Sequence, residues 1–213
     1  QRHGRRVADI DLLVSELDLS AAEAMLKCRG WDFSILDPYD ERFYREWMHE
    51  FPPMIHRERH SVVDLHHAIL PRTSRLHPET NRLLDRSIEV QPGIRVLCPS
   101  HMVLHAAAHL FHDGEISGAI RDVVDLDGLL RWFGNDRLFW PDLTRESAEL
   151  GLTRPAYYAL RYTERILSTP IPAEVRAAAA EWAPPAPVLS LMDFLVVRTL
   201  RRRPRCPAPS QGA

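Results

Sequence analysis

Three aspartates within apolar runs are the residues of this chain best suited to carry out chemistry. Asp9 and Asp11 stand two positions apart in V-A-D-I-D-L-L-V (residues 7–14), a run that predicts a buried strand. Side chains alternate along a strand, so both carboxylates are expected on one face. Asp64 and His66 share a face of a second apolar run in the same way. Neighbouring carboxylates in apolar surroundings need a counter-ion, and Mg²⁺ is suited to them because it prefers oxygen ligands.

Convergence of the three carboxylates would create a site for two-metal phosphoryl transfer. If the two strands are neighbours, Asp9, Asp11 and Asp64 meet at one spot. One ion would then hold a triphosphate, and the other would lower the pKa of an attacking hydroxyl. The sequence therefore predicts these three aspartates both as catalytic residues and as ligands of Mg²⁺. A purely structural interpretation stays open, since aspartates at strand ends also cap backbone groups or pair with arginine.

The elements that must position these aspartates change in character along the chain. Residues 1–92 mix short apolar runs with helical ones, which predicts an α/β core. Residues 93–200 keep a helical period and predict an all-helical C-terminal domain. Residues 201–213 are basic and then rich in proline, serine and glycine, which predicts a disordered tail. The expected fold class is therefore α+β, with a domain boundary near Gln91-Pro92-Gly93.

The positions of glycine and proline and the spacing of apolar residues predict where each strand and helix begins and ends. Strands are predicted at residues 7–14, 31–36, 54–57 and 61–70, with a short extended entry at 94–97. Helices are predicted at residues 21–29, 39–51, 78–87, 100–111, 115–133, 139–150, 154–167, 173–182 and 188–200. Ser20 and Glu23 are spaced as a capping box for the first helix, and Gly30 is a natural stop after it.

Four sequence motifs carry a resemblance to a known family. They are R-R-V-A-D-I-D-L-L-V (residues 5–14), V-V-D-L-H-H (62–67), V-L-C-P-S-H-M-V-L-H-A-A-A-H-L-F (96–111) and R-D-V-V-D-L (121–126). Over about residues 5–135, the chain resembles the uncharacterised nucleotidyltransferase family, part of the DNA polymerase β-like nucleotidyltransferase superfamily. The resemblance implies a nucleotidyltransferase-like mixed β-sheet with helices, followed by the helical domain.

The resemblance also implies a Mg²⁺-dependent enzyme that transfers an NMP group from an NTP to a hydroxyl of a small molecule, protein or RNA. Asp9 and Asp11 would be the metal-binding pair, and Asp64 the third carboxylate. Such enzymes cradle the triphosphate with a glycine-containing turn upstream, whereas only Gly4 precedes Asp9 here. Because the chain begins with Gln1, we expect a truncated N-terminus. The alternative is a catalytically inactive nucleotidyltransferase-fold binding module.

Basic and imidazole side chains near these motifs are candidates for contacts with the nucleotide. Those predicted to bind it are Arg6, His66, His109 and Arg121. A guanidinium binds phosphate through a planar fork of donors, although Arg121 has an alternative role as the surface ion-pair partner of Asp125.

Histidines also recur at helical spacing in the second half of the chain. They are His101, His105, His109 and His112. Pairs of histidines four residues apart bind Zn²⁺ on helices, so a zinc hydrolase is a further alternative. The other interpretation is a helix face that packs on the α/β core.

Composition narrows the class of protein further. The chain has 27 Lys+Arg and 29 Asp+Glu, a formal charge of −2, which argues against a dedicated nucleic-acid-binding protein. A hydrophobic content of 45% excludes disorder of the whole chain. Its three cysteines lack paired spacing and favour a reducing compartment. With no apolar run long enough for a bilayer, we expect a cytoplasmic protein that binds no membrane. Its expected partner, a nucleoside triphosphate, is what the resemblance implies.

Overall fold

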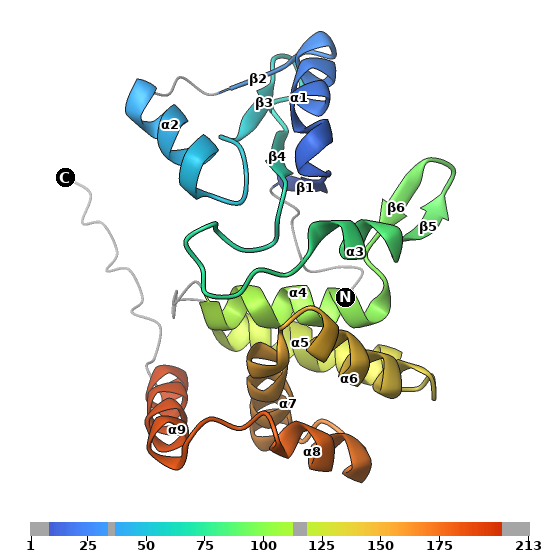
Figure 1. The fold of residues 1–213 in the computed structure, drawn as a ribbon, viewed down its shortest axis with the longest axis vertical. Coiled ribbons are helices and arrows are strands. Elements are labelled where there is room, and N and C mark those ends of the chain that lie inside the picture. Colours follow the sequence, from blue (N-terminus) through green and yellow to red (C-terminus); the bar gives the residue numbers. More distant parts are fainter. Residues whose placement is uncertain (1–8, 34–36, 113–118, 202–213) are drawn as a thin grey trace, which may run out of the picture.

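Helices dominate the structure, and the strands gather in the first half of the chain (Figure 1). The computed structural model describes residues 9–33, 37–112 and 119–201. The strands are β1 (Asp9–Leu13), β2 (Trp31–Phe33), β3 (Met54–His56), β4 (Val62–His66), β5 (Ile88–Gln91) and β6 (Ile94–Val96). The helices are α1 (Leu19–Cys28), α2 (Pro38–Trp47), α3 (Thr80–Asp85), α4 (Pro99–His112), α5 (Ala119–Phe133), α6 (Phe139–Glu149), α7 (Thr153–Leu167), α8 (Ala173–Ala180) and α9 (Ala186–Arg201). The expected α+β class is confirmed, and the predicted tail lies, except for its first residue, outside the described residues.

Strand β1 lies at the edge of a four-stranded mixed sheet with the order β1-β4-β3-β2. It pairs in parallel with β4, whereas β3 is antiparallel to both β4 and β2. Two small hydrophobic cores join the sheet to α1; their buried members are Leu19, Phe51 and Leu65, and Trp31, Met54 and Val63. Since Val63 and Leu65 belong to these cores, alternation along β4 turns Asp64 and His66 to the opposite face.

Local capping decides where α1 begins and ends. The side chain of Ser15 accepts a hydrogen bond from the backbone N–H of Asp18, and the 3₁₀ turn Glu16–Asp18 leads directly into the helix. The capping box predicted at Ser20 is therefore wrong, because Ser20 already lies inside α1. Gly30, with a φ of 90°, follows the helix as predicted and takes the left-handed conformation that glycine tolerates.

Helix α2 ends at Trp47, one turn earlier than predicted. The segment after it runs beside β4 instead of continuing the helix. The carbonyl oxygen of His49 accepts a hydrogen bond of 3.0 Å from the N–H of His67, and a β-bridge pairs Glu50 with His66. These bonds to the sheet satisfy backbone groups that another helical turn would have used.

The main hydrophobic core lies in the helical half, below the sheet in Figure 1. Its fully buried side chains include Leu104, Leu126, Leu130, Leu143 and Tyr162. The same core includes Ile69, Leu70 and Leu83, which precede the domain boundary predicted near residue 92. That boundary stays a prediction. Within the part of the chain that the structure describes, no helix combines the length and hydropathy needed to span a bilayer.

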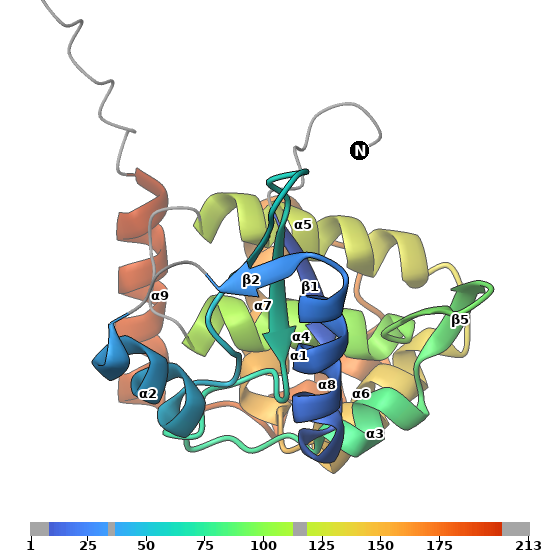
Figure 2. The same cartoon turned by 90° about the horizontal axis from the view of Figure 1, so that it is seen from above.

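The turn predicted at Gln91-Pro92-Gly93 joins the antiparallel strands β5 and β6. The first of these strands was not predicted. Its sequence, I-E-V-Q, alternates apolar and polar residues over only four positions, too few for a clear strand signal, and all four residues are exposed. In Figure 2 the hairpin extends away from the four-stranded sheet.

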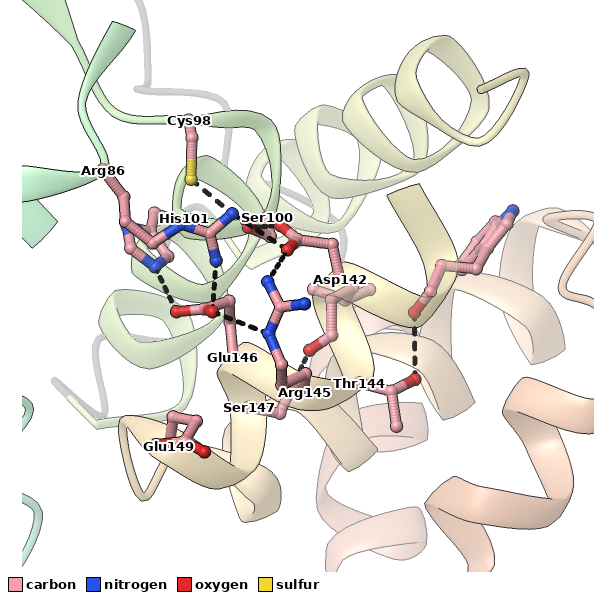
Figure 3. Close-up of polar contacts among 12 residues, drawn as sticks. Arg86, Cys98, Ser100, His101, Asp142, Thr144, Arg145, Glu146, Ser147 and Glu149 are labelled. Atoms are coloured by element: carbon pink, nitrogen blue, oxygen red, sulfur yellow. Dashed lines mark hydrogen bonds and ion pairs between the residues drawn. The ribbon is translucent and has the colours of Figure 1, made fainter. Parts of the chain in front are cut away.

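A buried ion cluster holds α3 against α4 and α6 (Figure 3). The carboxylate of Glu146 is fully buried; it accepts hydrogen bonds of 2.8 and 2.9 Å from Arg82 and a further one from Arg86. Nε2 of His101, also fully buried, lies 2.8 Å from the same carboxylate. Burial opposes ionisation of Glu146, but Arg82, His101 and Arg86 outweigh it and lower its pKa to about 2. Glu146 is therefore ionised at neutral pH and joins three helices.

Replacing Glu146 by Gln is expected to destabilise the protein, because its cationic partners lose a buried counter-charge. The free energy of unfolding should fall by about 3 kcal/mol at pH 7, measured by urea denaturation. A pKa lowered from 4.5 to about 2 stabilises the fold fully above pH 4.5, and this contribution is lost as the pH falls toward about 2. Glu146→Gln should therefore lose less stability than the wild type over this acid range.

The matched control is Glu149→Gln, on the same helix, whose side chain is 53% exposed. It should cost less than about 1 kcal/mol. Equal stability of Glu146→Gln and wild type at pH 7 would show that the cluster does not hold the helices together.

Candidate functional site

The pairing of β1 with β4 brings the predicted carboxylates together. In this parallel pair Asp11 lies opposite Asp64, and Asp9 lies opposite Val62. Partners in register point to the same face of a sheet, so the three aspartates share the face that α1 leaves uncovered. The arrangement of neighbouring strands that the sequence analysis required is therefore present.

Asp64 is the most enclosed of these carboxylates. Its Oδ1 atom is buried and accepts no hydrogen bond from any residue that the structure describes, whereas the side chain of Asp11 is 65% exposed. Burial raises the pKa of Asp64, and the negative charges of Asp9 and Asp11 raise it further. The site therefore combines an enclosed oxygen with an excess of negative charge, which a cation would stabilise.

His66 is a basic group that lies beside this excess of charge. Its Nε2 atom lies 3.4 Å from Oδ1 of Asp11 and 3.3 Å from Oε2 of Glu50. Burial disfavours the charged imidazole, but the carboxylates of Asp11, Glu50 and Asp64 outweigh it and raise the pKa of His66. The same contact with His66 is the main cause of a lowered pKa of Asp11. The pair therefore keeps Asp11 ionised at neutral pH.

Asp11 lines two pockets between the sheet and the helical half. One has a volume of about 530 Å³ and includes His66, and the other has a volume of about 520 Å³. The polar residues that line the second pocket are Asp11, His105, His109, Asp122 and Asp125. Small-molecule sites in proteins have volumes of roughly 300–1,000 Å³. Asp11 thus opens onto space that can take a ligand of nucleotide size.

The side chains predicted to contact a nucleotide lie in different places. His66 is beside Asp11, and His109 lines the second pocket. Arg121 is exposed at the start of α5 and is not among the residues that line these two pockets, whereas its neighbour Asp122 is. Arg6 lies outside the described residues. The nucleotide-binding roles of these residues stay predictions.

The histidines of α4 are divided between two environments. His101 is fully buried against α6, whereas His105 and His109 have ring centroids 6.4 Å apart and line the second pocket. Among the described residues, no group of histidines from this helix has ligand atoms close enough to hold one metal ion. The packing interpretation therefore holds for His101. The described residues offer no site on α4 for the zinc ion of a hydrolase.

Comparison with known proteins addresses the family. A family model described as an uncharacterised nucleotidyltransferase matches residues 1–168, which is most of the chain. The chain belongs to the uncharacterised nucleotidyltransferase family. The family assigns it a general role in nucleotidyl transfer. Searches of curated proteins and of solved structures gave no significant match.

The donor set of this nucleotidyltransferase fits a hard divalent cation such as Mg²⁺. Asp9, Asp11 and Asp64 offer only carboxylate oxygens, the ligands that Mg²⁺ prefers. The enclosed Oδ1 of Asp64 is the observation that favours a cation, because a buried oxygen without a donor is costly. As placed, the three carboxylates do not form a group with ligand atoms within 4.8 Å of one another, so their side chains would have to rotate to share one ion.

Sequence reasoning missed several residues around the nucleotidyltransferase site. Glu50 was placed inside a helix, and its contact with His66 depends on a bridge between segments distant in the chain. Asp122 had no predicted role, and Asp125 was predicted only as a surface ion-pair partner of Arg121, whereas both line the second pocket. A pocket between separate elements leaves no local sequence pattern. The only signal for this side of the second pocket was the pair of aspartates within the motif 121–126.

Substituting Asp11 by Asn is expected to lower the pKa of His66 in the metal-free protein, because the imidazolium loses the carboxylate that lies 3.4 Å from its Nε2 atom. The measurement is an NMR titration of the His66 ring in the presence of a chelator. Asp9→Asn serves as the control. The carboxylates that raise the pKa of His66 are Asp11, Glu50 and Asp64, so the pKa of His66 should shift less in Asp9→Asn. An unchanged His66 pKa in Asp11→Asn would contradict the ion pair.

Proposed function

We propose that this nucleotidyltransferase uses Mg²⁺ to transfer an NMP group from an NTP to a hydroxyl acceptor. The observation that carries the proposal is the register of β1 and β4, which sets Asp11 opposite Asp64 with Asp9 beside them. The enclosed oxygen of Asp64, which has no donor among the described residues, supports it. So does the raised pKa of Asp64, which results from burial and then from the negative charges of Asp9 and Asp11. Such convergence of carboxylates suits two-metal phosphoryl transfer.

The three aspartates would divide the work of the reaction. Asp9 and Asp11 would hold Mg²⁺, which when bound offsets the charge of the triphosphate. Asp64 would orient the acceptor hydroxyl and accept its proton, and a raised pKa makes it a stronger base than an ordinary carboxylate. The acceptor oxygen would form a bond to the α-phosphorus while the bond to the leaving pyrophosphate breaks.

The second pocket would receive the nucleotide in one orientation. Its α4 wall presents His105 and His109, which can donate hydrogen bonds to phosphate, and its α5 wall presents Asp122 and Asp125. Carboxylates repel phosphate and accept hydrogen bonds from hydroxyl groups. Phosphates would therefore lie nearer α4, and ribose or acceptor hydroxyls nearer α5. The acceptor itself would be a small molecule, a protein or an RNA.

Asp11→Asn is expected to reduce Mg²⁺-dependent turnover of NTP by at least about 100-fold, because it removes a metal-binding charge. The measurement is release of pyrophosphate from each of the four NTPs, together with transfer of an α-phosphate label to protein, RNA or small-molecule fractions. Asp32→Asn is the matched control, an aspartate of the same sheet on the far edge strand β2, and it should keep wild-type activity.

Two outcomes would count against catalysis at this site. Unchanged turnover in Asp11→Asn would place the reaction elsewhere. Binding of Mg²⁺ and NTP in calorimetry without any release of pyrophosphate, across all acceptor fractions, would favour the inactive binding module.

A further inference from the structure

A second group of potential metal ligands lies where the segment after α2 meets β4. His49, Glu50 and His66 each offer one ligand atom, and these atoms all lie within 4.8 Å of one another. Nε2 of His66 is 3.3 Å from Oε2 of Glu50, and the rings of His49 and His66 have centroids 5.3 Å apart. The three side chains thus converge from two segments that are distant in sequence.

The separation of His66 and Glu50 matches that of two ligands around a single metal ion, and all three ligand atoms lie within 4.8 Å of one another. Two ligands bonded at about 2.1 Å and separated by a tetrahedral angle are about 3.4 Å apart. The contact between His66 and Glu50 is 3.3 Å, and Oδ1 of Asp11 lies 3.4 Å from the same His66 nitrogen. Asp11 therefore lies beside this group but belongs to the carboxylate site. Small side-chain rotations would bring His49 to the same distance.

Backbone hydrogen bonds hold the group in place before any ion binds. The carbonyl oxygen of His49 accepts hydrogen bonds from the N–H groups of His67, at 3.0 Å, and Ala68, at 3.3 Å. The next residue, Glu50, forms an antiparallel β-bridge with His66 of β4. The side chains of Glu50 and His66 are only 21% and 15% exposed. A fixed and partly dehydrated set of donors binds an ion with less loss of conformational entropy.

The donor atoms distinguish this group from the carboxylate site. Two imidazoles and a carboxylate suit borderline transition-metal ions, whereas Mg²⁺ prefers oxygen ligands alone. Zinc sites commonly combine histidine with Asp or Glu, and the same ligand types bind Mn²⁺ and Fe²⁺.

We propose that His49, Glu50 and His66 bind a divalent transition-metal ion of the Zn²⁺ class, next to the Mg²⁺ carboxylates but distinct from them. The ion would fasten the segment after α2 to β4 and place a fixed positive charge beside Asp11. The proposal does not depend on nucleotidyl transfer, because it concerns binding of the metal alone.

The test is titration of the chelator-treated full chain with ZnCl₂ by calorimetry, and with CoCl₂ by visible absorption, which reports histidine ligation. We expect one tight site per chain. His49→Ala and Glu50→Gln should each weaken Zn²⁺ binding by at least about 10-fold. Glu50→Gln keeps the shape of the side chain, so it tests the ligand charge even where His49→Ala disturbs folding, which far-UV circular dichroism checks.

Three variants serve as controls. His77→Ala removes an exposed histidine, His109→Ala removes a histidine of α4, and Asp9→Asn weakens the carboxylate site; all three should keep the tight Zn²⁺ site. Loss of zinc in His109→Ala or Asp9→Asn, with binding kept in His49→Ala and Glu50→Gln, would overturn the assignment. Absence of any tight Zn²⁺ or Co²⁺ site in the wild type would overturn it as well. Neither result would bear on pyrophosphate release, so the two proposals fail separately.

Discussion

Negative charge gathered where β1 pairs with β4 is the constraint on which the functional half of the structure depends. The register sets Asp11 opposite Asp64, and the charges of Asp9 and Asp11 raise the pKa of Asp64. His66 is placed to offset part of that charge, since it lies within ion-pair distance of both Asp11 and Glu50. Like charges this close together favour a cation nearby, because an opposite charge offsets their repulsion.

The negative charges of Glu146 and of Asp64 are compensated to different degrees. In the helical half, arginines and a histidine surround Glu146, and its pKa falls to about 2. At the sheet, Asp64 has a raised pKa and an oxygen that no described residue donates to. The first cluster is complete within the chain and holds helices together. The second is not complete among the described residues, which is the physical reason to regard it as a site for a bound cation.

Placement of the site on a sheet edge also explains the role of the helical half. Helices α4 and α5 form the wall that faces the carboxylates, and they carry His105, His109, Asp122 and Asp125 into the pocket. The buried cluster around Glu146 anchors α4 through His101 to α6. The same helix thus packs through one side and faces the candidate site through another.

Much of the fold could be predicted from local sequence because helix and strand periods are local properties. The runs around Asp9 and Asp64 became β1 and β4, and the helical bounds from α4 to α9 agree with the predicted ranges within a few residues. The failures have physical causes. A 3₁₀ turn capped by Ser15 leads into α1 before the predicted capping box, so Ser20 lies inside the helix. Helix α2 stops at Trp47, and the following backbone bonds to the β4 segment.

Taken alone, the sequence determined the types of chemical groups and their faces: a D-x-D on one strand, Asp64 with His66 on another, and a family resemblance that the family match confirmed. The tertiary structure decided which groups meet. It set Asp11 against Asp64, brought Glu50 to His66, and separated His101 from His105. Alternation and helical period follow from each residue's own backbone, whereas strand register and helix packing depend on contacts between segments far apart in the chain.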